Sequence, residues 1–458
     1  MLPFDFKNIN FIHFVGVGGI GISALAKFFL AQGKSVSGSD IADSAIIKDV
    51  KQMGVKVNIG HKIENLDAKT QLVIVSNAIP ENNPEILEAK KRDLPIISQF
   101  EALGLLSAGS RTIAIAGTNG KSTTTAMTGL ILEESRMDPT VFVGSFLPQW
   151  KGNLRVGKLN TFVVEADEYQ RKFLSLVPQI LALTNIEADH LDYYKDLEDI
   201  KSAFKELIKK VETNGTAIYN ADDPTSLDAL NSSVIPAEAG IQIINYGKNG
   251  KEVKLLSVDV REQKQIVKIN FFGKPEEFEL RVPGLFNVYN ALAAAACAGV
   301  LGIDFPTIAL ALGKYKGIWR RFELRGTAGK TLIISDYAHH PTALLATMKA
   351  AREFYPGKKI LLVFQPHQYR RTKLLFEDFI TALSAADPDK LILAEVYDVA
   401  GREDADKSVG SKQLADKISE ELPNTVYAAN LEETEKLIRA DLPNFDIVIV
   451  MGAGDIDG

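Results

Sequence analysis

Short apolar runs that do not alternate with polar residues recur along the whole chain, and helical patterns separate them. A strand that is apolar throughout is buried on both faces, which is typical of parallel sheets covered by helices. Examples of such runs are residues 11–17, 72–76, 112–116, 161–165, 180–184, 331–335, 359–364, 390–394 and 446–451. This alternation predicts an α/β fold with mostly parallel sheets.

Two helices stand out between these runs. The segment 196–211 places apolar residues on one face and Lys and Glu on the other. Its apolar positions are Ile200, Phe204, Leu207, Ile208 and Val211. The segment 286–303 is apolar nearly all round but contains Asn and Tyr, so we expect a buried helix rather than a membrane span.

The length predicts several domains. At about 150 residues per domain, 458 residues correspond to roughly three. Small and polar residues at 107–111 and a Gly-rich segment at 325–330 suggest the boundaries, and residues 253–284 alternate as an antiparallel ribbon at the edge of a central domain would. The segment 232–242 fits neither pattern, and we expect a surface loop there.

Composition excludes several classes of protein. The formal net charge of −6 favours neither nucleic acid nor an anionic membrane as a partner. Cys297 is the only cysteine and can form no internal disulfide, so we expect a reducing compartment. Residues 1–10 include an acidic residue and no long apolar core, so we do not expect a signal peptide. Together these features favour a cytoplasmic protein.

The first Gly-rich loop, 16-GVGGIG-21, lies between an apolar strand and a helical segment. Gly16 permits a tight turn, Gly18 lets the backbone approach a diphosphate, and Gly21 allows close packing of helix and strand. Asp40 follows about 20 residues later, at the end of the next strand, where a carboxylate can accept from a ribose hydroxyl. The pattern indicates a diphosphate next to a ribose, which NAD and a UDP-sugar both present.

A second loop, 116-AGTNGKSTTT-125, lies about a hundred residues later and also follows an apolar strand. It lacks the first Gly of a standard phosphate-binding loop but keeps Gly117, Gly120, Lys121 and Ser122. Backbone N–H groups at a helix start can hold phosphates, Lys121 can reach the β- and γ-phosphates, and the Ser122 hydroxyl can bind Mg²⁺. This loop predicts an ATP site.

Acidic residues follow two later strands. Glu165 ends an apolar strand, where ligands bind in α/β sheets, and Mg²⁺ on a nucleotide needs one or two carboxylates. His190 stands among acids after the strand at 180–184. Taken alone it is a structural loop histidine, but opposite a phosphate loop it becomes a candidate metal ligand.

These motifs occur in a recognisable order. The segments are 116-AGTNGKSTTT-125, 165-EADE-168, 184-TNIEADHLD-192, 286-FNVYNALAA-294, 317-GIWRRFELRG-326, 336-DYAHHPT-342 and 364-FQPHQYRRT-372. Over nearly its whole length the chain resembles the Mur ligase family, the ATP-dependent amide-bond ligases of peptidoglycan precursor synthesis. The segments 12–26 and 364–372 are most similar to the branch that joins L-alanine to UDP-N-acetylmuramate.

The resemblance implies three domains and two nucleotide sites. Residues 1–108 would be a Rossmann-like domain that binds the UDP-sugar, residues 109–326 a central ATPase, and residues 327–458 a Rossmann-like domain that binds the amino acid. ATP and Mg²⁺ would be the cofactors. ATP would convert the sugar's carboxylate to an acyl phosphate, which the amine then attacks. A site built by two domains would close on binding and exclude water.

The resemblance also implies roles for individual residues. Lys121, Glu165, His190 and Arg321 would be catalytic. Ser122, Glu165 and His190 would hold metal, with His190 on a second ion near the substrate's carboxylate. The remaining assignments fall into three groups. ATP would be bound by Gly117, Thr118, Asn119, Gly120, Lys121, Ser122, Thr123, Asn287, Asn290, Arg321 and Asp336. The UDP-sugar would be bound by Gly16, Gly18, Gly19, Gly21, Asp40 and Ser76. The amino acid would be bound by His339, His340 and Arg371, although His340, which precedes Pro341, could equally cap a helix.

Some positions depart from the family's pattern. Asn119 and Ser122 stand where the L-alanine branch usually has His and Thr, Phe286 where it has His, and Gln368 where it has Arg. The sequence ends at Gly458 without the terminal helix that the resemblance leads us to expect. Gln368 removes one expected cation from amino-acid recognition.

Three other functions remain open from the sequence. A ligase that joins a preformed tripeptide to the same sugar would share most motifs but lack 364–372. A nicotinamide-dependent oxidoreductase would use the first loop and leave the second unexplained. A non-catalytic nucleotide sensor would not need Lys121 or Glu165, and both are present.

Overall fold

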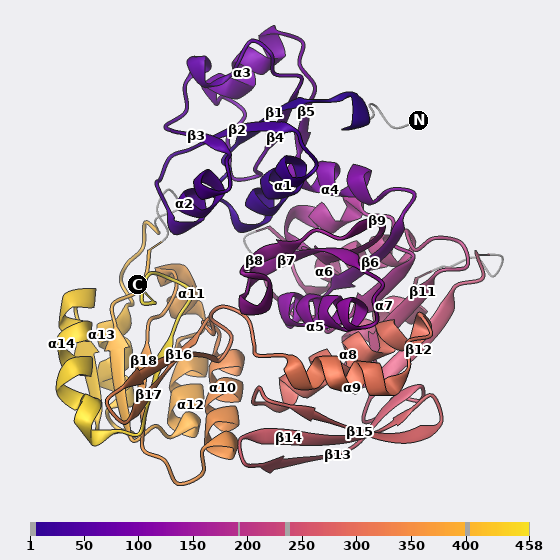
Figure 1. Cartoon of the computed structure of the whole chain (residues 1–458). Coiled ribbons are helices and arrows are strands. Elements are labelled where there is room, and N and C mark those ends of the chain that lie inside the picture. Colours follow the sequence, from indigo (N-terminus) through magenta and orange to yellow (C-terminus); the bar gives the residue numbers. More distant parts are fainter. Residues whose placement is uncertain (1–5, 191–192, 234–238, 399–403, 458) are drawn as a thin grey trace. The chain divides into compact units, whose positions relative to one another are not determined.

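The computed structural model describes residues 6–190, 193–233, 239–398 and 404–457, and it contains three β-sheets with helices packed on them (Figure 1). The α/β fold predicted from the apolar runs is therefore confirmed. Of the predicted loop at 232–242, residues 234–238 lie outside the described residues. No helix in the described ranges is long and apolar enough to cross a membrane.

The first sheet has five strands in the order β3-β2-β1-β4-β5. All pair in parallel, and the order reverses beside β1, as in doubly wound folds that bind ligands at such a point. The strands are β1 Phe11–Val15, β2 Ser35–Asp40, β3 Lys56–Ile59, β4 Leu72–Val75 and β5 Ile96–Ser98. The helices are α1 Ile20–Ala31, α2 Ala45–Gln52, α3 Pro84–Lys91 and α4 Gln99–Ser107.

The second sheet has ten strands in the order β15-β14-β13-β12-β11-β10-β6-β9-β7-β8. Its first strands are β6 Arg111–Ala116, β7 Pro139–Leu147, β8 Gly152–Arg155, β9 Lys158–Ala166, β10 Ile180–Leu183, β11 Thr216–Asn220 and β12 Gln242–Gly247. The associated helices are α5 Lys121–Glu134, α6 Leu197–Ile208, α7 Pro224–Asn231, α8 Leu285–Val300 and α9 Phe305–Lys314. Strand β6, which leads into the second Gly-rich loop, lies between β10 and β9 in the interior of the sheet.

The predicted ribbon is present at one edge of this sheet. It consists of β13 Val253–Arg261, β14 Lys264–Phe271 and β15 Lys274–Leu280. Two residues join each pair of neighbouring strands, so the strands run antiparallel. Both turns have two consecutive residues with positive φ, as the turn that matches strand twist requires: Glu262 and Gln263 at 48° and 58°, and Phe272 and Gly273 at 47° and 87°.

The third sheet has six strands in the order β16-β17-β21-β18-β19-β20. They are β16 Glu323–Ala328, β17 Thr331–Asp336, β18 Ile360–Phe364, β19 Lys390–Ala394, β20 Thr425–Ala428 and β21 Ile447–Met451. The helices are α10 Pro341–Phe354, α11 Tyr369–Leu374, α12 Phe376–Ala386, α13 Ser411–Ile418 and α14 Leu431–Asp441. The Gly-rich segment 325–330, predicted as a boundary, forms most of β16 and its turn into β17.

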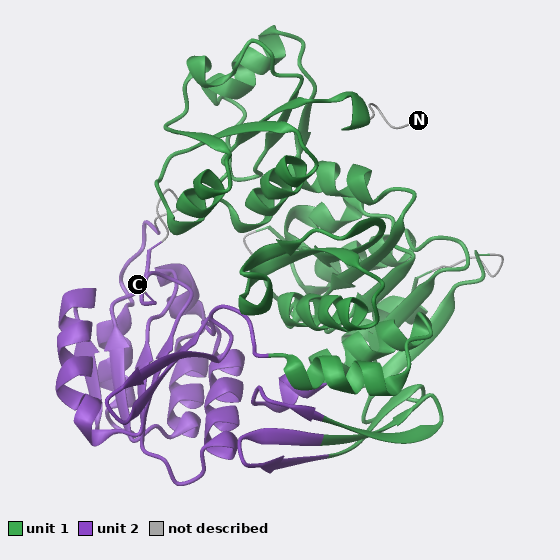
Figure 2. Ribbon diagram, in the orientation of Figure 1, with its two compact units in different colours: residues 1–257, 267–278, 289–315 green, residues 258–266, 279–288, 316–458 purple. Residues whose placement is uncertain are grey.

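The chain divides into two compact units (Figure 2). Unit 1 consists of residues 1–257, 267–278 and 289–315, and unit 2 of residues 258–266, 279–288 and 316–458. The first sheet and most of the second belong to unit 1, and the third sheet belongs to unit 2.

The two predicted helices are present. Asp196 caps α6 by accepting from the N–H of Asp199, and the apolar face predicted for this helix is buried. The helix ends at Ile208, so Val211 lies beyond it and is buried there. Helix α8 is buried through its alanine-rich middle, as predicted for 286–303.

One apolar core runs through the first two sheets. Phe28 on α1 packs with its ring centroid 5.6 Å from that of Phe142 on β7 and 6.5 Å from that of Phe162 on β9. The same buried cluster includes Phe14 of β1 and Phe204 of α6. The helix that follows the first Gly-rich loop is therefore packed against the sheet that carries the second.

Candidate active site

The second Gly-rich loop turns sharply between β6 and α5. Gly117 and Gly120 have φ values of 136° and 85°, which side-chain-bearing residues rarely adopt. A Cβ at Gly117 would lie 2.0 Å from Thr184 Oγ1, and one at Gly120 would lie 2.2 Å from Asn290 Oδ1. Both glycines are therefore required by shape as well as by backbone conformation.

The segment after β10 holds the rest of this loop. Asn185 accepts from the Thr118 N–H through its carbonyl, and from the Asn119 N–H through its side chain, both at 2.9 Å. Thr184 Oγ1 donates to the Asn119 carbonyl at 2.6 Å. Thr123 continues into α5 and is buried. The loop is thus preorganised at the carboxyl end of the sheet.

Lys121 begins α5 and turns back over the loop. Its Nζ donates to the carbonyls of Gly117 and Thr118 at 2.6 and 3.0 Å, and lies 2.8 Å from Glu168 Oε2. Burial alone would lower the pKa of Lys121, but the carboxylates of Glu168 and Asp167 outweigh burial and raise it, so the ammonium stays charged.

The structure brings Ser122 and Glu165, two of the predicted metal ligands, together. Ser122 Oγ donates to Glu165 Oε1 at 3.0 Å, and the Gly144 N–H donates to Glu165 Oε2 at 2.7 Å. A Cβ at Gly144 would lie 2.7 Å from both carboxylate oxygens. Gly144 was not singled out from the sequence, because nothing in its strand pattern indicates that a carboxylate packs against it.

His190 groups with two other acids rather than with Glu165. Asp167, Glu168 and His190 each offer one atom within 4.8 Å of the others, and Glu165 is not in that group. His190 Nε2 lies 3.7 Å from Glu168 Oε1. The backbone of His190 is left-handed, with φ 53°, and its N–H donates to Asp189 Oδ1 at 2.7 Å. The sequence alone identifies Asp167 and Glu168 only as acids at the end of a strand.

A strained turn follows Glu168. Gln170 and Arg171 both have left-handed backbones, with φ of 56° and 57°. The Arg171 guanidinium donates to Asp199 Oδ1 and Ser202 Oγ on α6, each at 2.7 Å, and also to Glu206. Helix α6 thereby fixes the segment that carries the acidic pair.

The first Gly-rich loop has the predicted tight turn, with Gly16 at φ 78° and a Cβ there only 3.0 Å from Ser76 Cβ. Asp40 Oδ2 accepts from the Gly18 N–H at 2.8 Å, so the strand-end carboxylate lies over the loop. Gly19 is the N-cap of α1. Gly21 does not mark close helix–strand packing, because the nearest atoms to a Cβ there belong to the Gln99 side chain, at 3.4 Å.

The two asparagines predicted to bind adenine lie on α8. Asn290, in unit 1, accepts from Thr124 Oγ1 at 3.3 Å and so contacts the helix that follows the second Gly-rich loop. Asn287 belongs to unit 2 and donates to the Pro283 carbonyl at 2.7 Å.

Arg321 and Asp336 lie together in unit 2. The Arg321 guanidinium is 5.1 Å from the centre of the Tyr337 ring. Asp336 is buried, and its oxygens accept from the N–H groups of Phe322 and Ala338 at 2.7 and 2.8 Å. Burial raises the pKa of Asp336, and nearby Arg321 opposes that shift.

Two of the predicted amino-acid residues, His339 and Arg371, contact the aromatic residues of a cluster in unit 2. Arg371 Nη1 donates to His367 Nδ1 at 3.3 Å, and the His367 and His339 rings are 5.6 Å apart. Burial and then Arg371 lower the pKa of His339 to about 3 and that of His367 to about 4, so both are neutral at pH 7. His340 is the N-cap residue of α10, but its side chain makes no capping hydrogen bond.

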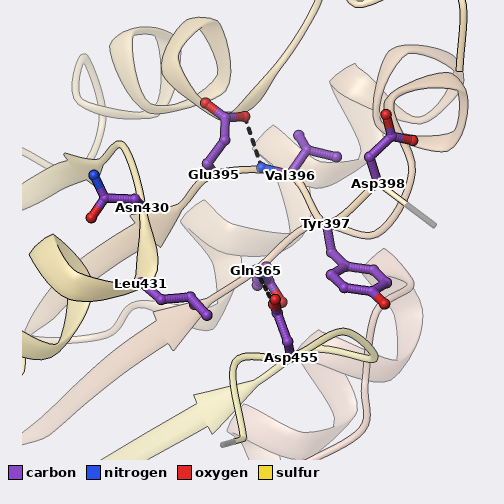
Figure 3. A pocket seen from close by; sticks show the side chains of 8 residues that line it. All are labelled: Gln365, Glu395, Val396, Tyr397, Asp398, Asn430, Leu431 and Asp455. Carbon is purple, nitrogen blue, oxygen red and sulfur yellow. Dashed lines mark hydrogen bonds between the residues drawn. The ribbon is translucent and has the colours of Figure 1, made fainter. Parts of the chain in front are cut away.

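A cavity of about 310 Å³ opens beside these rings (Figure 3). It lies at the carboxyl ends of β18, β19, β20 and β21 and includes none of the predicted site residues. Its lining comprises Gln365, Glu395, Val396, Tyr397, Asp398, Asn430, Leu431 and Asp455. Tyr397, which lines the cavity, also stacks on His367 with the ring centroids 5.5 Å apart.

Three family descriptions match the chain in succession. Residues 11–111 match the Mur ligase family catalytic domain, residues 115–298 the Mur ligase middle domain, and residues 320–454 the Mur ligase glutamate ligase domain. The chain is a Mur ligase. The resemblance that the motifs indicate is thereby confirmed, and the second Gly-rich loop, Glu165 and His190 all fall within the middle-domain match.

Two curated Mur ligases are similar over nearly the full length. The UDP-N-acetylmuramate–L-alanine ligase of Lachnospira eligens is 40% identical over 100% of this chain and 98% of its own. The ligase of the same name from a Sulfurihydrogenibium species is 38% identical over 97% of this chain and 95% of its own.

Solved Mur ligase structures have the same fold. The crystal structure of the UDP-N-acetylmuramate–alanine ligase from Thermotoga maritima superposes with a TM-score of 0.82 at 29% identity, covering 98% of this chain and 96% of that one. A murein peptide ligase from Psychrobacter arcticus superposes with a TM-score of 0.71 at 24% identity, covering 98% and 96%, which is a likeness of fold.

Proposed function

We propose that this Mur ligase joins L-alanine to the carboxylate of UDP-N-acetylmuramate at the expense of ATP, in cytoplasmic peptidoglycan precursor synthesis. The observation that carries the proposal is the grouping of Lys121, Ser122 and Glu165 at one end of the central sheet. It occurs in a chain 38–40% identical, over nearly its whole length, to ligases named for this reaction.

The reaction needs both nucleotide sites. A carboxylate and an amine do not condense in water because the departing oxygen is a poor leaving group. In the first step a carboxylate oxygen attacks the γ-phosphorus of ATP, and ADP leaves. In the second the amine attacks the acyl carbon, and the tetrahedral intermediate collapses as phosphate leaves and the nitrogen loses its proton. Lys121 and Arg321 are proposed to offset the repulsion between ATP and the sugar's carboxylate.

The donor atoms around the ATP loop fit Mg²⁺. The hydroxyl of Ser122 and the carboxylate of Glu165 are the oxygen ligands that this ion prefers, and they already meet at 3.0 Å. Asp167, Glu168 and His190 offer a second group of ligand atoms. Bound at these places, Mg²⁺ would supply positive charge to the transferring phosphoryl group.

The other substrates are assigned to loops with fitting chemistry. The UDP diphosphate is proposed at Gly16, Gly18, Gly19, Gly21 and Ser76, with Asp40 on the ribose. The adenosine is proposed at Asn287, Asn290 and Asp336. The Asp336 carboxylate now accepts from two backbone N–H groups. To accept from a ribose hydroxyl it would have to give up one of these two hydrogen bonds.

Arg371 is proposed to pair with the α-carboxylate of the amino acid, since its forked donors suit a carboxylate. The neutral rings of His339 and His367 place no positive charge beside the incoming amine. Gln368, which stands where an Arg is usual, leaves Arg370 and Arg371 as the cations of this motif, and of these two Arg371 contacts His367. His340 remains a proposed contact of the amino acid.

The predicted division into domains 1–108, 109–326 and 327–458 also stays a proposal. The three sheets and the three successive family matches support three domains, whereas the proposed bound between residues 326 and 327 falls within β16 of the third sheet. The division into compact units does not separate the first two of these domains, since most residues of both belong to unit 1.

The deciding experiment measures phosphate release from ATP and Mg²⁺ in the presence of UDP-N-acetylmuramate. L-alanine, glycine, L-serine and a tripeptide are added in turn, and products are identified by mass. We expect L-alanine to give release, with a product heavier by one alanyl residue. Release with the tripeptide alone would instead identify a muropeptide ligase. No release with any of them, together with NAD binding to the first loop, would contradict the proposal.

A further inference from the structure

All three N–H donors of the Lys121 ammonium have acceptors in this structure. An ammonium group has three donors, and the Lys121 Nζ has three acceptors: the Gly117 carbonyl at 2.6 Å, the Thr118 carbonyl at 3.0 Å and the Glu168 carboxylate at 2.8–3.0 Å. To donate to a phosphate, Lys121 must give up one of them. Of these three acceptors, Glu168 alone is charged and Glu168 alone lies outside the loop.

Glu168 is buried, so solvent has little access to its carboxylate. Its side chain is 3% exposed, and that of Lys121 is 13% exposed. The Glu168 backbone is fixed as well, because its carbonyl accepts from the Arg171 N–H at 2.9 Å and from the Tyr194 hydroxyl. A buried carboxylate left without a partner is strongly destabilising, so Lys121 cannot leave unless something else meets this charge.

A second set of partners stands on the other side of the same carboxylate. His190 Nε2 lies 3.7 Å from Glu168 Oε1, and one atom each of Asp167, Glu168 and His190 lie within 4.8 Å of one another. Two acids and an imidazole at this spacing form a group that a divalent cation would complete.

We propose that Glu168 acts as a latch. Its carboxylate holds Lys121 as long as no nucleotide is bound. When a nucleotide binds, Lys121 moves to the phosphates and the Glu168 carboxylate turns to a cation held with Asp167 and His190. This inference rests on the proposed function in taking residues 117–122 as a nucleotide site.

The latch links two binding events. A nucleotide without a cation must break the Lys121–Glu168 pair and leave Glu168 uncompensated, so it binds weakly. When the cation is present it takes over Glu168, and the same nucleotide then binds more tightly. Such coupling is reciprocal, so the nucleotide must tighten cation binding by the same factor.

The test measures ATP binding by calorimetry, first in EDTA and then with Mg²⁺, in the wild type and in Glu168→Gln. Without a cation, we expect Glu168→Gln to bind ATP about tenfold more tightly, because the wild type must first populate an open state. With Mg²⁺ the gain should shrink or reverse. Mn²⁺ binding followed by electron paramagnetic resonance should be weaker in the variant. Unchanged or weaker ATP binding in EDTA would overturn the proposal.

Asp167→Asn is the matched control. It removes a neighbouring carboxylate of the same charge, but Asp167 lies 3.7 Å from Lys172 Nζ and makes no hydrogen bond to Lys121. We expect its ATP affinity in EDTA to change much less than that of Glu168→Gln. An equal gain in both variants would show that general charge, not the latch, limits binding, and would overturn the proposal.

Two further measurements keep the result decisive. If Glu168→Gln does not fold, Glu168→Asp retains the charge but is one methylene shorter, and it should also bind cation-free ATP more tightly than the wild type. None of these readouts uses the sugar or the amino acid. ATP binding that follows the latch pattern in a protein that releases no phosphate would therefore contradict the ligase proposal alone.

Discussion

Glu85 at the start of α3 is a buried acid with an unusual number of partners. It accepts from the Ser39 hydroxyl at 2.6 Å and from the Asn65 amide at 2.7 Å, and its Oε2 lies 2.9 Å from His13 Nε2. Burial by itself would raise its pKa, but the hydrogen bonds from His13, Ser39 and Asn65 more than offset burial and lower the pKa to about 2.

This residue should make the protein's stability depend on acid. The pKa of Glu85 is about 2 in the folded protein and 4.5 for an ordinary glutamate. This difference corresponds to about 3 kcal/mol of unfolding free energy. Because the pKa is depressed on folding, this contribution is complete above pH 4.5 and is lost as the pH falls towards 2. Glu85→Gln should flatten that part of the curve in denaturant titrations at several pH values. Glu81→Gln, at an exposed position just before α3, should keep the wild-type slope.

Gly144 leaves room for a carboxylate that has a proposed role. A methyl group there would lie 2.7 Å from both oxygens of Glu165, so Gly144→Ala must push that carboxylate away from Ser122. We expect the Mg²⁺ concentration that gives half-maximal phosphate release to rise roughly tenfold, the loss of a metal ligand's orientation. Gly152→Ala on β8 is the control, since its Cβ would meet nothing nearer than 3.8 Å. An unchanged Mg²⁺ requirement in Gly144→Ala would remove Glu165 from the metal site.

At the scale of elements, the turn after β9 stores strain. Left-handed backbones at consecutive residues with side chains cost of order 1–3 kcal/mol each, and here they occur at Gln170 and Arg171. The anchors of the Arg171 guanidinium on α6 offset part of that cost. The acidic pair Asp167 and Glu168 lies just before the strained residues.

Removing the anchor should therefore affect the metal group more than the fold. Arg171→Met is expected to lower the unfolding free energy by about 1–2 kcal/mol, typical for a partly exposed position, and to weaken Mn²⁺ binding several-fold. Arg439→Met removes an ion pair with Glu435 on the regular helix α14 and is the control for loss of a surface charge. Equal Mn²⁺ binding in wild type and Arg171→Met would show that the turn does not position the acids.

The elements that sequence predicted are those with a buried side. Runs such as 180–184 and 446–451 became interior strands, because a strand with two covered faces must be apolar throughout. Strand β3, 56-KVNI-59, lies at a sheet edge and is largely exposed, so no apolar pattern marked it. Strand β16 was not predicted, because Gly326 and Gly329 give residues 325–330 the composition of a loop.

The candidate site divides in the same way. The Ser122–Glu165 pair follows from chemistry at strand ends, which share one edge of a parallel sheet. The partners of His190 do not follow, because they depend on left-handed turns at His190, Gln170 and Arg171. Such conformations at residues other than Gly or Asn leave no periodic trace in a sequence.

At the scale of the whole molecule, the shared core makes the first two sheets one folding unit. Phe28 is almost completely buried between them and packs against Phe142 and Phe162. Phe28→Ala should cost about 3–5 kcal/mol and lower the protection of both β1 and β6 in hydrogen exchange. Phe364→Ala, equally buried in unit 2, should leave those two strands protected. Loss of protection in β1 alone would show that the first sheet unfolds independently.

The single cysteine has a practical consequence. Cys297 is buried in α8, and burial raises its pKa to about 12, so its thiol is almost never the reactive thiolate. We therefore expect the unmodified protein to react very slowly with thiol reagents. A cysteine introduced at an exposed position in each unit, for example Lys209→Cys and Lys436→Cys, would be the only place where a fluorophore or spin label attaches. The natural sequence thus already provides the clean background that measurements of distance between the two units, with and without substrates, would otherwise have to engineer.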